Sequence, residues 1–343
     1  MTAPQTLTIP ALTAKIEAIF QRARFSAAQA AAIAPVIAAG ERDACKSHGV
    51  YRIEGCLRSL KIGKVNPGAV PEVIASEGSI VRVDAKGGFS PLAFELGLPL
   101  LVERARTQGL AALVINDCFH FSALWVEVER LAAEGLAAMA MCPSYATVAP
   151  HGGSAPLLGT NPFAFGWPRP DGAPYVFDFA TSVAARGEVE LHRRAGTPLP
   201  EGWAVDAEGQ PTTDPQAALD GAMLTFGGHK GSAIATMIEL LAGAMIGDLN
   251  SVEALDWLGT TAVAPKHGEL ILAFDPARFA GGRRDPLAAA ELILSGIEGQ
   301  GARLPSGRRR AARVISEAEG ITLSAAEIEG LERLARDGLA AVP

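Results

Sequence analysis

The chain has 343 residues, of which 49% are hydrophobic and 20% are charged, so it carries enough apolar sequence for a large core and for more than one domain. Its 37 acidic residues outnumber 30 Lys and Arg residues, which gives a net charge of -7. This acidic balance argues against nucleic acids and anionic membranes as partners, because both bind basic surfaces.

The four cysteines show no close spacing of the kind that binds metals, and no basic start with an apolar run indicates a secretory leader. The apolar run at 240–245 is too short to cross a membrane and is interrupted by Gly243. We therefore expect a cytoplasmic protein with no membrane segment and no bound metal.

The N-terminal part of the chain predicts helices followed by a hairpin. Residues 11–42 are rich in Ala, with Ile, Leu and Phe at helical intervals, and Ser26 with Gln29 resembles a capping box that starts a second helix. Residues 73–85 predict a short hairpin. Ser90 and Pro91 then open an apolar helix, which we expect to bend at Pro99.

The central part predicts strands around a helix. Short apolar runs at 110–115 and 136–142 are typical of strands, with a helical stretch at 122–134 between them, and 175–179 is another strand candidate. The polar, Pro- and Gly-rich stretch 193–220 indicates an exposed excursion, either an active-site loop or a surface insertion.

Two further helices are predicted in the last third of the chain. The helix after Lys230 places five apolar side chains on one face for core packing: Ile234, Met237, Ile238, Leu241 and Met245. The last helix starts at a capping box and buries its apolar face: Ser324 and Glu327 form the box, and Ile328, Leu331 and Leu334 form the face.

An anion site is indicated at 225–232, where three glycines surround His229 and Lys230 just before a helix. Glycines let the backbone approach a ligand, the helix start presents free N–H groups, and Lys230 adds positive charge. A phosphorylated cofactor would fit such a site. A solvated turn with a helix cap is the alternative.

A second candidate site lies at 47–52, Ser-His-Gly-Val-Tyr-Arg. If this segment is helical, His48 and Arg52 lie on the same face. A histidine transfers protons near neutral pH, and a guanidinium binds a carboxylate through two hydrogen bonds. A capped helix with an ordinary surface arginine explains the spacing equally well.

A third candidate lies between a predicted strand and a predicted helix, where ligands often bind. Backbone donors at the helix start, with Ser122 as a cap, would suit a pyrophosphate. The residues concerned are His120, Phe121, Ser122, Ala123 and Leu124.

Two more segments combine small polar residues with turns or strand ends. Thr160 and Asn161 can donate hydrogen bonds to a substrate carboxylate, although a plain turn is equally compatible. Asp178, Phe179 and Ala180 end a strand and could hold a ribose, with Arg186 and Glu188 soon after them. Glu188 could orient His48, although exposed loop acids are commoner.

A basic cluster near the C-terminus could bind the 2′-phosphate of NADP, although charge runs are more often solvated loops. It comprises Arg303, Ser306, Gly307, Arg308, Arg309 and Arg310. The chain contains no G-x-G-x-x-G after a strand, no Walker P-loop, no H-E-x-x-H and no C-x-x-C, which disfavours an ordinary Rossmann domain, a P-loop NTPase and a zinc enzyme.

Taken in order over nearly the whole chain, these segments resemble the malate/L-lactate dehydrogenase-type oxidoreductase family. The stretches 118–125 and 226–248 are most similar to its branch of NADPH-dependent cyclic ketimine reductases. The resemblance implies an α/β protein with a non-Rossmann NADP-binding fold, a mixed, largely antiparallel sheet and a helical N/C-terminal domain. We divide the chain into a helical domain (1–72 and 299–343), a small α+β segment (73–117) and a cofactor-binding domain (118–298).

The same resemblance implies roles for the candidate residues. His48 would donate the proton, Ser47 and Glu188 would complete its relay, and Arg52 and Thr160 would hold the substrate carboxylate. The implied NADPH site comprises His120, Phe121, Ser122, Ala123, Leu124, Asp178, Phe179, Ala180, His229, Lys230, Arg303, Ser306, Gly307, Arg308 and Arg309.

The implied reaction is the NADPH-dependent reduction of Δ1-piperideine-2-carboxylate to L-pipecolate and of Δ1-pyrroline-2-carboxylate to L-proline. The alternative is an NAD(P)-dependent dehydrogenase of a small 2-hydroxy acid such as malate, lactate or ureidoglycolate, with His48 as the base. A protein that binds the nucleotide without turnover is a further alternative. The resemblance also implies a homodimer.

Overall fold

The computed structural model describes residues 3–120, 123–170 and 172–342. Its centre is a seven-stranded sheet in the order β2-β3-β4-β11-β5-β6-β7. β3 and β4 pair in parallel, and the other neighbours pair antiparallel. The strands are β2 (Glu72–Glu77), β3 (Ile80–Asp84), β4 (Leu110–Phe119), β5 (Ala137–Met141), β6 (Phe163–Trp167), β7 (Tyr175–Phe179) and β11 (Lys266–Phe274). The α/β class and the mixed, largely antiparallel sheet are thereby confirmed.

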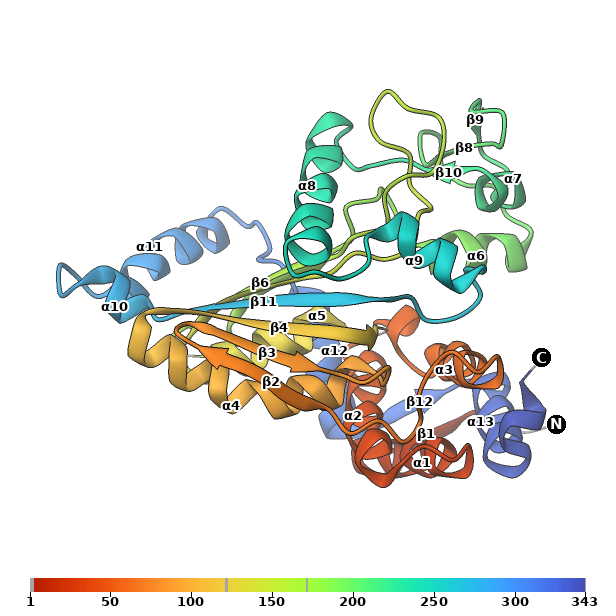
Figure 1. The fold of residues 1–343 in the computed structure, drawn as a ribbon, viewed down its shortest axis with the longest axis horizontal. Coiled ribbons are helices and arrows are strands. Elements are labelled where there is room, and N and C mark those ends of the chain that lie inside the picture. Colours follow the sequence, from red (N-terminus) through yellow and green to blue (C-terminus); the bar gives the residue numbers. More distant parts are fainter. Residues whose placement is uncertain (1–2, 121–122, 171, 343) are drawn as a thin grey trace.

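Helices cover both faces of this sheet (Figure 1). Helices α4 (Ser90–Gln108) and α5 (Leu124–Ala133) pack on one face, and α8 (His229–Glu239) packs on the other. In β4, Leu113 packs toward the first face and Val114 toward the second. Because successive side chains of a strand point to opposite faces, a strand covered on both sides reads as a continuous apolar run.

The two chain ends form one helical unit beside the sheet (Figure 1). A short antiparallel pair, β1 with β12, joins them. Ser26 caps its helix by accepting from Gln29 N–H, and Ser324 with Glu327 forms the predicted capping box. The elements are β1 (Gln5–Leu7), α1 (Ile9–Arg22), α2 (Ala27–Arg42), α3 (Tyr51–Lys61), β12 (Ile321–Leu323) and α13 (Ala325–Asp337).

A third unit lies on the α8 side of the sheet and includes the predicted excursion 193–220 (Figure 1). The excursion is not structureless, because it carries short strands around a small apolar core. The unit contains α6 (Arg186–Ala195), β8 (Ala204–Val205), β9 (Pro211–Thr212), α7 (Pro215–Asp220), β10 (Ala222–Met223) and α9 (Ser251–Leu258).

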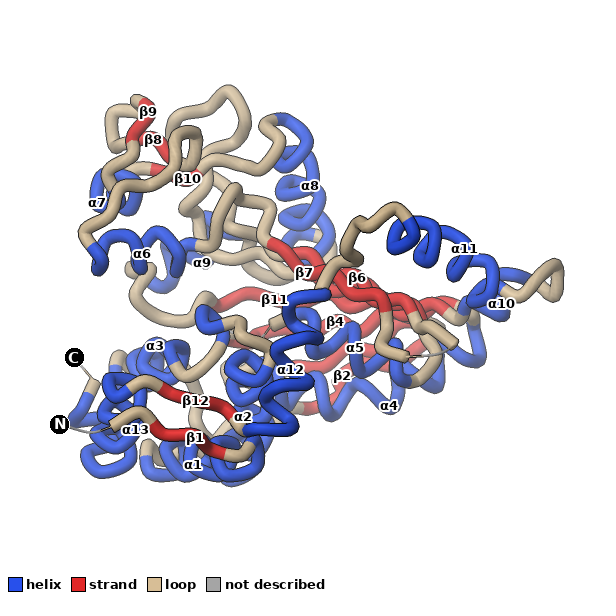
Figure 2. The backbone as a smooth tube through the Cα atoms, turned by 180° about the vertical axis from the view of Figure 1, so that it is seen from behind, coloured by secondary structure: helices blue, strands red, loops and turns tan. Residues whose placement is uncertain are grey.

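Three more helices connect the last sheet strand to the C-terminal unit. They are α10 (Pro276–Ala280), α11 (Pro286–Gly299) and α12 (Gly307–Glu319). Figure 2 shows α12 running from the β7 end of the sheet toward the helical unit. Among the described residues, no helix combines the length and the apolar character that a membrane crossing needs.

The structure corrects two local predictions. Residues 116–119 continue β4 rather than forming a loop, because Asp248 accepts hydrogen bonds from the Asn116 side chain and from Asp117 N–H. The expected apolar face after Lys230 is interrupted by a π-helical turn at Leu240–Ala244. This turn shifts the helical period, so that Met245 is 60% exposed and Ile246 is buried instead.

The segment 73–117 supplies β2, β3 and β4 to the central sheet. The sheet therefore continues across the boundary expected between residues 117 and 118. The division into three domains stays a prediction.

One buried carboxylate joins three of these elements. Asp43, directly after α2, accepts hydrogen bonds from Arg42, from Arg313 of α12 (2.6 and 2.9 Å) and from Trp125 Nε1 of α5 (3.1 Å). Burial alone would raise the pKa of Asp43, but hydrogen bonds from Arg313 and Arg42 hold this pKa below its usual value. Neutralising Asp43 removes its ion pairs with Arg42 and Arg313, although Arg313 keeps a second carboxylate partner, Glu129, at 2.8 Å.

We expect Asp43→Asn to lower the free energy of unfolding by about 1–3 kcal/mol at pH 7, the cost of losing hydrogen bonds to a buried charged group. The contribution of a carboxylate with a depressed pKa is present above its unfolded pKa and is lost as the pH falls through the folded one. Urea unfolding of both proteins between pH 7 and pH 3 measures the difference, which should shrink toward the acid end. Asp337→Asn, in an exposed pair with Arg336, is the control and should change little; an equal effect of both substitutions would contradict the assignment.

Candidate active site

The turn that carries His48 is held tightly against α2. Residues Lys46–His48 form a single 3-10 turn. A Cβ added at Gly40 would lie only 2.4 Å from the His48 carbonyl oxygen, so this helix position requires glycine. The buried carboxylate of Glu41 accepts a hydrogen bond from Val50 N–H (2.8 Å) and binds the Lys46 ammonium group. Close contact with α2 therefore fixes the backbone around His48.

The His48 imidazole is half-buried between a hydroxyl and an aromatic ring. Ser47 Oγ lies 3.1 Å from Nδ1, within hydrogen-bond distance. The Trp125 ring meets the imidazole edge-on, with centroids 5.6 Å apart. The expected contact between Ser47 and His48 is therefore present, and Trp125 adds an apolar wall that limits the orientation of the ring.

The surroundings of His48 favour its neutral form. Burial, together with the positive charges of Arg52, His120 and Arg309, lowers the pKa of His48 to about 3. A neutral imidazole can accept a hydrogen bond at one nitrogen and donate at the other. It becomes an acid only if a bound anion offsets the surrounding positive charge.

The expectation that His48 and Arg52 share a helix face is wrong. The chain turns after His48, and α3 begins only at Tyr51. Arg52 N–H donates to the Gly49 carbonyl (2.9 Å), which holds the start of α3 against this turn. The charge of Arg52 still contributes to lowering the pKa of His48.

A cavity of about 570 Å³ opens beside this turn. Ser47, Arg52 and Tyr145 line it, together with Arg186 and Thr261. Arg186 donates to Thr261 Oγ1 (3.2 Å), and burial lowers the pKa of its guanidinium. Arg52 and Arg186 are two of the five arginines that line the cavity, which also carries three glutamates, and a guanidinium there can bind a small carboxylate. Sequence spacing singled out only Arg52.

Two expected partners of this site lie elsewhere. Glu188, in the first turn of α6, is exposed, and no hydrogen bond or ion pair joins its side chain to the described residues, so the expected relay to His48 is not formed here. Thr160 does not line the cavity; its carbonyl accepts from Thr181 N–H and from the Thr181 hydroxyl. The neighbouring Asn161 amide is buried and donates to Glu239, so it is structural.

Strand β7 connects the site to the start of α5. The carboxylate of Asp178 accepts a hydrogen bond from Trp125 N–H (3.0 Å) at the first turn of α5. Burial raises the pKa of Asp178 to about 6, although Arg309 and the Trp125 N–H oppose the shift. The side chains of Ala123 and Leu124 are buried in the core, so only their backbone can contact a ligand. Phe121 and Ser122 lie outside the described residues.

The start of α12 also packs against this strand. Ser306, in the left-handed backbone region, donates its hydroxyl to the Val176 carbonyl, and Arg309 donates to Ser306 Oγ. The Arg309 guanidinium lies 4.7 Å from the centroid of the Trp125 ring. The same ring also contacts His48. Arg303, Gly307 and Arg308 are exposed. Within the basic cluster, Ser306 and Arg309 thus contact β7 and Trp125, whereas Arg303, Gly307 and Arg308 face solvent.

The glycine-rich segment before α8 packs against the end of the same strand. Phe226 meets Phe179 edge-on at 5.6 Å, and its N–H donates to Thr181. Gly227 and Gly228 have positive φ values of 55° and 59°. His229 and Lys230 follow as exposed side chains at the helix start. Four of the predicted cofactor segments therefore meet around β7, and Ala180 directly follows that strand.

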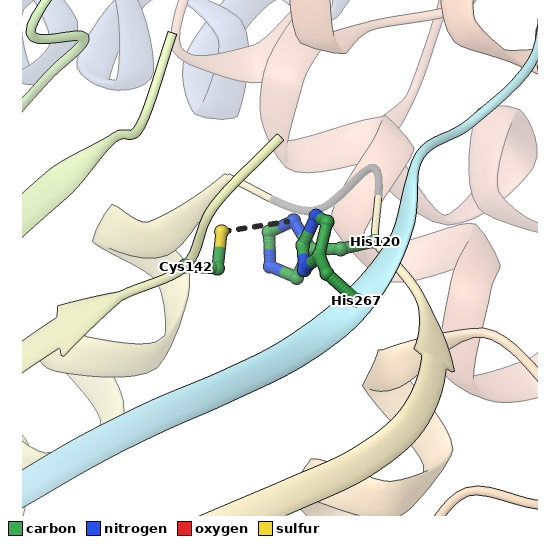
Figure 3. Close-up of side chains that lie close together, drawn as sticks. All are labelled: His120, Cys142 and His267. Atoms are coloured by element: carbon green, nitrogen blue, oxygen red, sulfur yellow. Dashed lines mark hydrogen bonds between the residues drawn. The ribbon is translucent and has the colours of Figure 1, made fainter. Parts of the chain in front are cut away.

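A compact buried cluster lies beneath these segments. His120 follows β4, Cys142 follows β5 and His267 belongs to β11 (Figure 3). Cys142 Sγ lies 3.7 Å from His120 Nδ1, and the His120 and His267 rings are 5.6 Å apart. Of the candidate residues, only His120 belongs to this cluster.

Comparison with known proteins agrees with this geometry. A family profile described as malate/L-lactate dehydrogenase matches residues 7–332. The chain belongs to the malate/L-lactate dehydrogenase family. A Δ1-pyrroline-2-carboxylate reductase of Agrobacterium fabrum is 69% identical over 339 residues, covering 98% of each chain.

Two further relatives of this family carry related names. A Δ1-pyrroline-2-carboxylate/Δ1-piperideine-2-carboxylate reductase of Pseudomonas aeruginosa is 57% identical over 89% of this chain and 92% of its own. The crystal structure of Δ1-piperideine-2-carboxylate reductase from Pseudomonas syringae pvar. tomato superposes with a TM-score of 0.91, 42% identity and coverage of 96% and 99%. The whole architecture is therefore shared with this branch of the family.

We expect NMR of the imidazole groups to show that His48 stays neutral from pH 8 down to about pH 4, because its pKa is about 3. Arg52→Gln removes one nearby positive charge and should move the His48 midpoint to higher pH. Arg58→Gln, farther along α3 in a pair with Glu54, is the control and should leave it unchanged. Protonation of wild-type His48 near pH 6 would contradict the stated environment.

Proposed function

We propose that this protein reduces cyclic imino acids with NADPH, converting Δ1-pyrroline-2-carboxylate to L-proline and Δ1-piperideine-2-carboxylate to L-pipecolate. The observation that supports this most directly is a cavity lined by Arg52, Arg186 and Ser47, whose hydroxyl lies 3.1 Å from His48 Nδ1. A small carboxylate that needs one proton at an adjacent atom matches that arrangement. The names of the relatives at 57% and 69% identity support the same substrate class.

In this proposal the substrate carboxylate pairs with Arg52, and Arg186 adds a second positive charge on the same cavity. Bidentate pairing with a guanidinium fixes both the position and the plane of a carboxylate. Thr160 is a further donor to the substrate in our proposal, by resemblance to the family. Orienting the imine carbon in this way is the main contribution of binding to the rate.

His48 supplies the proton to the imine nitrogen. The negative charge of the bound carboxylate offsets the positive charge of Arg52. This raises the pKa of His48, so that the imidazole can carry a proton. Ser47, 3.1 Å from Nδ1, orients the ring. Glu188 would join this relay only after its exposed side chain turns toward Ser47, whose Cβ lies 3.9 Å from a Cβ built on the neighbouring Gly187.

The residues around β7 fit a dinucleotide. The start of α8 lies beside Gly227 and Gly228, with His229 and Lys230 exposed next to them. We assign pyrophosphate binding to this helix start, because helix starts bind anions. The remaining contacts are assigned to His120, Phe121, Ser122, Ala123, Leu124, Asp178, Phe179, Ala180, Arg303, Ser306, Gly307, Arg308 and Arg309. When bound, the nicotinamide supplies the hydride that the imine carbon accepts.

We further propose a homodimer in a reducing, cytoplasmic setting. The described part of the chain exposes large apolar side chains on two helices, with Leu292 and Ile293 of α11 at 77% and 68% and Val314 of α12 at 66%. Exposed apolar side chains of this kind are frequent at subunit interfaces. The four cysteines are free thiols, as a reducing compartment would keep them.

The test of this function is NADPH oxidation with the five- and six-membered cyclic imino acids beside pyruvate and oxaloacetate. We expect turnover with the imino acids, and His48→Ala should lower it by about 10²–10⁴-fold. NADPH binding, followed by its fluorescence, should persist in that variant. His192→Ala, at a histidine that pairs with Thr197 on α6, is the control.

Full turnover by His48→Ala would remove His48 from the mechanism. Oxidation of 2-hydroxy acids with NAD, without imine reduction, would support the alternative dehydrogenase, in which His48 acts as the base. NADPH binding without turnover of any of these compounds would indicate a protein that only binds the nucleotide.

The preference for NADPH over NADH is a separate prediction. Arg308 is exposed at the start of α12, and we assign it to the 2′-phosphate. Arg308→Ser should raise the KM for NADPH by about 10–100-fold, the loss of one charge-assisted contact, and should leave the KM for NADH nearly unchanged. Arg284→Ser, in the exposed segment before α11, is the matched control. An equal change with both cofactors would exclude this role.

A further inference from the structure

The buried cluster of His120, Cys142 and His267 has the composition of a metal site. Its members come from three different strands or strand ends, which pair through β11 in the centre of the sheet. Their exposed fractions are 5%, 1% and 0%. One donor atom from each lies within 4.8 Å of the other two. Sequence spacing could not indicate this grouping, because the ligands of spaced metal motifs are close neighbours in the chain.

One donor–donor distance matches tetrahedral coordination. Cys142 Sγ and His120 Nδ1 are 3.7 Å apart. A tetrahedral ion with metal–sulfur and metal–nitrogen bonds of about 2.3 and 2.0–2.1 Å places two such donors about 3.6 Å apart. This pair is therefore spaced as an ion between them would require, and the His267 donor lies within 4.8 Å of both.

Outer partners orient both imidazoles toward the cluster. His267 Nδ1 lies 2.8 Å from the Gly268 carbonyl, so Nδ1 carries the proton and leaves the lone pair on Nε2, which has no hydrogen-bond partner among the described residues. His120 Nε2 lies 3.4 Å from Glu269 Oε1, on the side of the ring away from Cys142. A carboxylate or carbonyl behind each imidazole is typical of metal-binding histidines.

The charge around the cluster also favours a cation. Glu269 is fully buried, and neither of its oxygens has a geometric hydrogen bond within the described part of the chain. Glu127, also buried, lies next to it. His120 Nε2, 3.4 Å from Oε1, is the cationic partner of Glu269 when the ring is protonated. An ion bound at Nδ1 of His120 would supply positive charge to these two buried carboxylates through the same ring.

We propose that His120, Cys142 and His267 form a binding site for one zinc-class transition-metal ion, with two nitrogen ligands, one thiolate and an open fourth position. Binding removes the Cys142 thiol proton to solvent, so one proton is released for each ion bound. The proposal does not rest on imine reduction, although the metal site shares His120 with the proposed cofactor segment. The competing explanation of the same geometry is a simple hydrogen bond from the Cys142 thiol to His120.

Cobalt(II) titration of the chelator-treated, full-length protein distinguishes the two explanations. We expect one equivalent to bind, with a near-ultraviolet thiolate-to-cobalt band, tetrahedral visible bands and release of about one proton per ion. Zinc should displace the cobalt and erase the bands. Glu269→Gln should weaken binding about 10–100-fold, the usual effect of losing an outer partner.

Cys142→Ser should lose the thiolate band, and Cys118→Ser should keep it. Cys118 is an equally buried thiol, but its Sγ lies 3.1 Å from the His267 carbonyl instead of facing His120. Circular dichroism establishes that both variants fold. If Cys142→Ser does not fold, thiol alkylation of the wild-type protein, located by peptide mass spectrometry, takes its place: zinc should protect Cys142 and leave Cys118 unchanged.

The proposal is overturned if the wild-type protein shows no thiolate band with cobalt, or if the band survives Cys142→Ser. Loss of the band from Cys118→Ser with retention by Cys142→Ser would also overturn it. Imine reduction can fail or succeed in each of these cases, so the metal site and the proposed function are tested separately.

Discussion

The buried carboxylate of Asp43 is the contact on which the site geometry depends. It joins the end of α2, the Trp125 indole of α5 and Arg313 of α12, three elements far apart in the chain. The Trp125 ring in turn contacts both His48 and Arg309. One ion pair therefore sets the relative position of the proton-donating candidate and the basic cluster.

Strand β7 has a comparable role for the cofactor segments. Asp178 binds the start of α5, Phe179 packs against the glycine-rich turn before α8, and Val176 accepts from Ser306 at the start of α12. Each of these segments presents a helix start, where unpaired N–H groups and the helix dipole favour anions. A strand at the sheet edge can collect several such helix starts because its far side carries no further strand.

Local signals in the sequence predicted the elements well, and contacts between distant elements limited the rest. The helix caps at Ser26 and Ser324 depend on residues three positions away, so the sequence alone could predict them. The extension of β4 through Asn116 depends on Asp248, 132 residues later. The sequence alone therefore predicted a strand only over 110–115. Arg186 and Arg52 line one cavity although 134 residues separate them in the chain, so their spacing could not indicate it. Glu188 was assigned to His48 by resemblance, and the structure leaves it exposed.

The electrostatics of the site explain why an acidic chain presents a cationic cavity. His48 is surrounded by Arg52, His120 and Arg309, and burial removes the water that would solvate a charged imidazole. Protonation of His48 is therefore opposed twice. In the proposed reaction an incoming carboxylate would remove part of this opposition, which would couple substrate binding to protonation of His48. A neutral molecule of the same size would leave His48 unprotonated, so the proposed site would select anions through His48 as well as through Arg52.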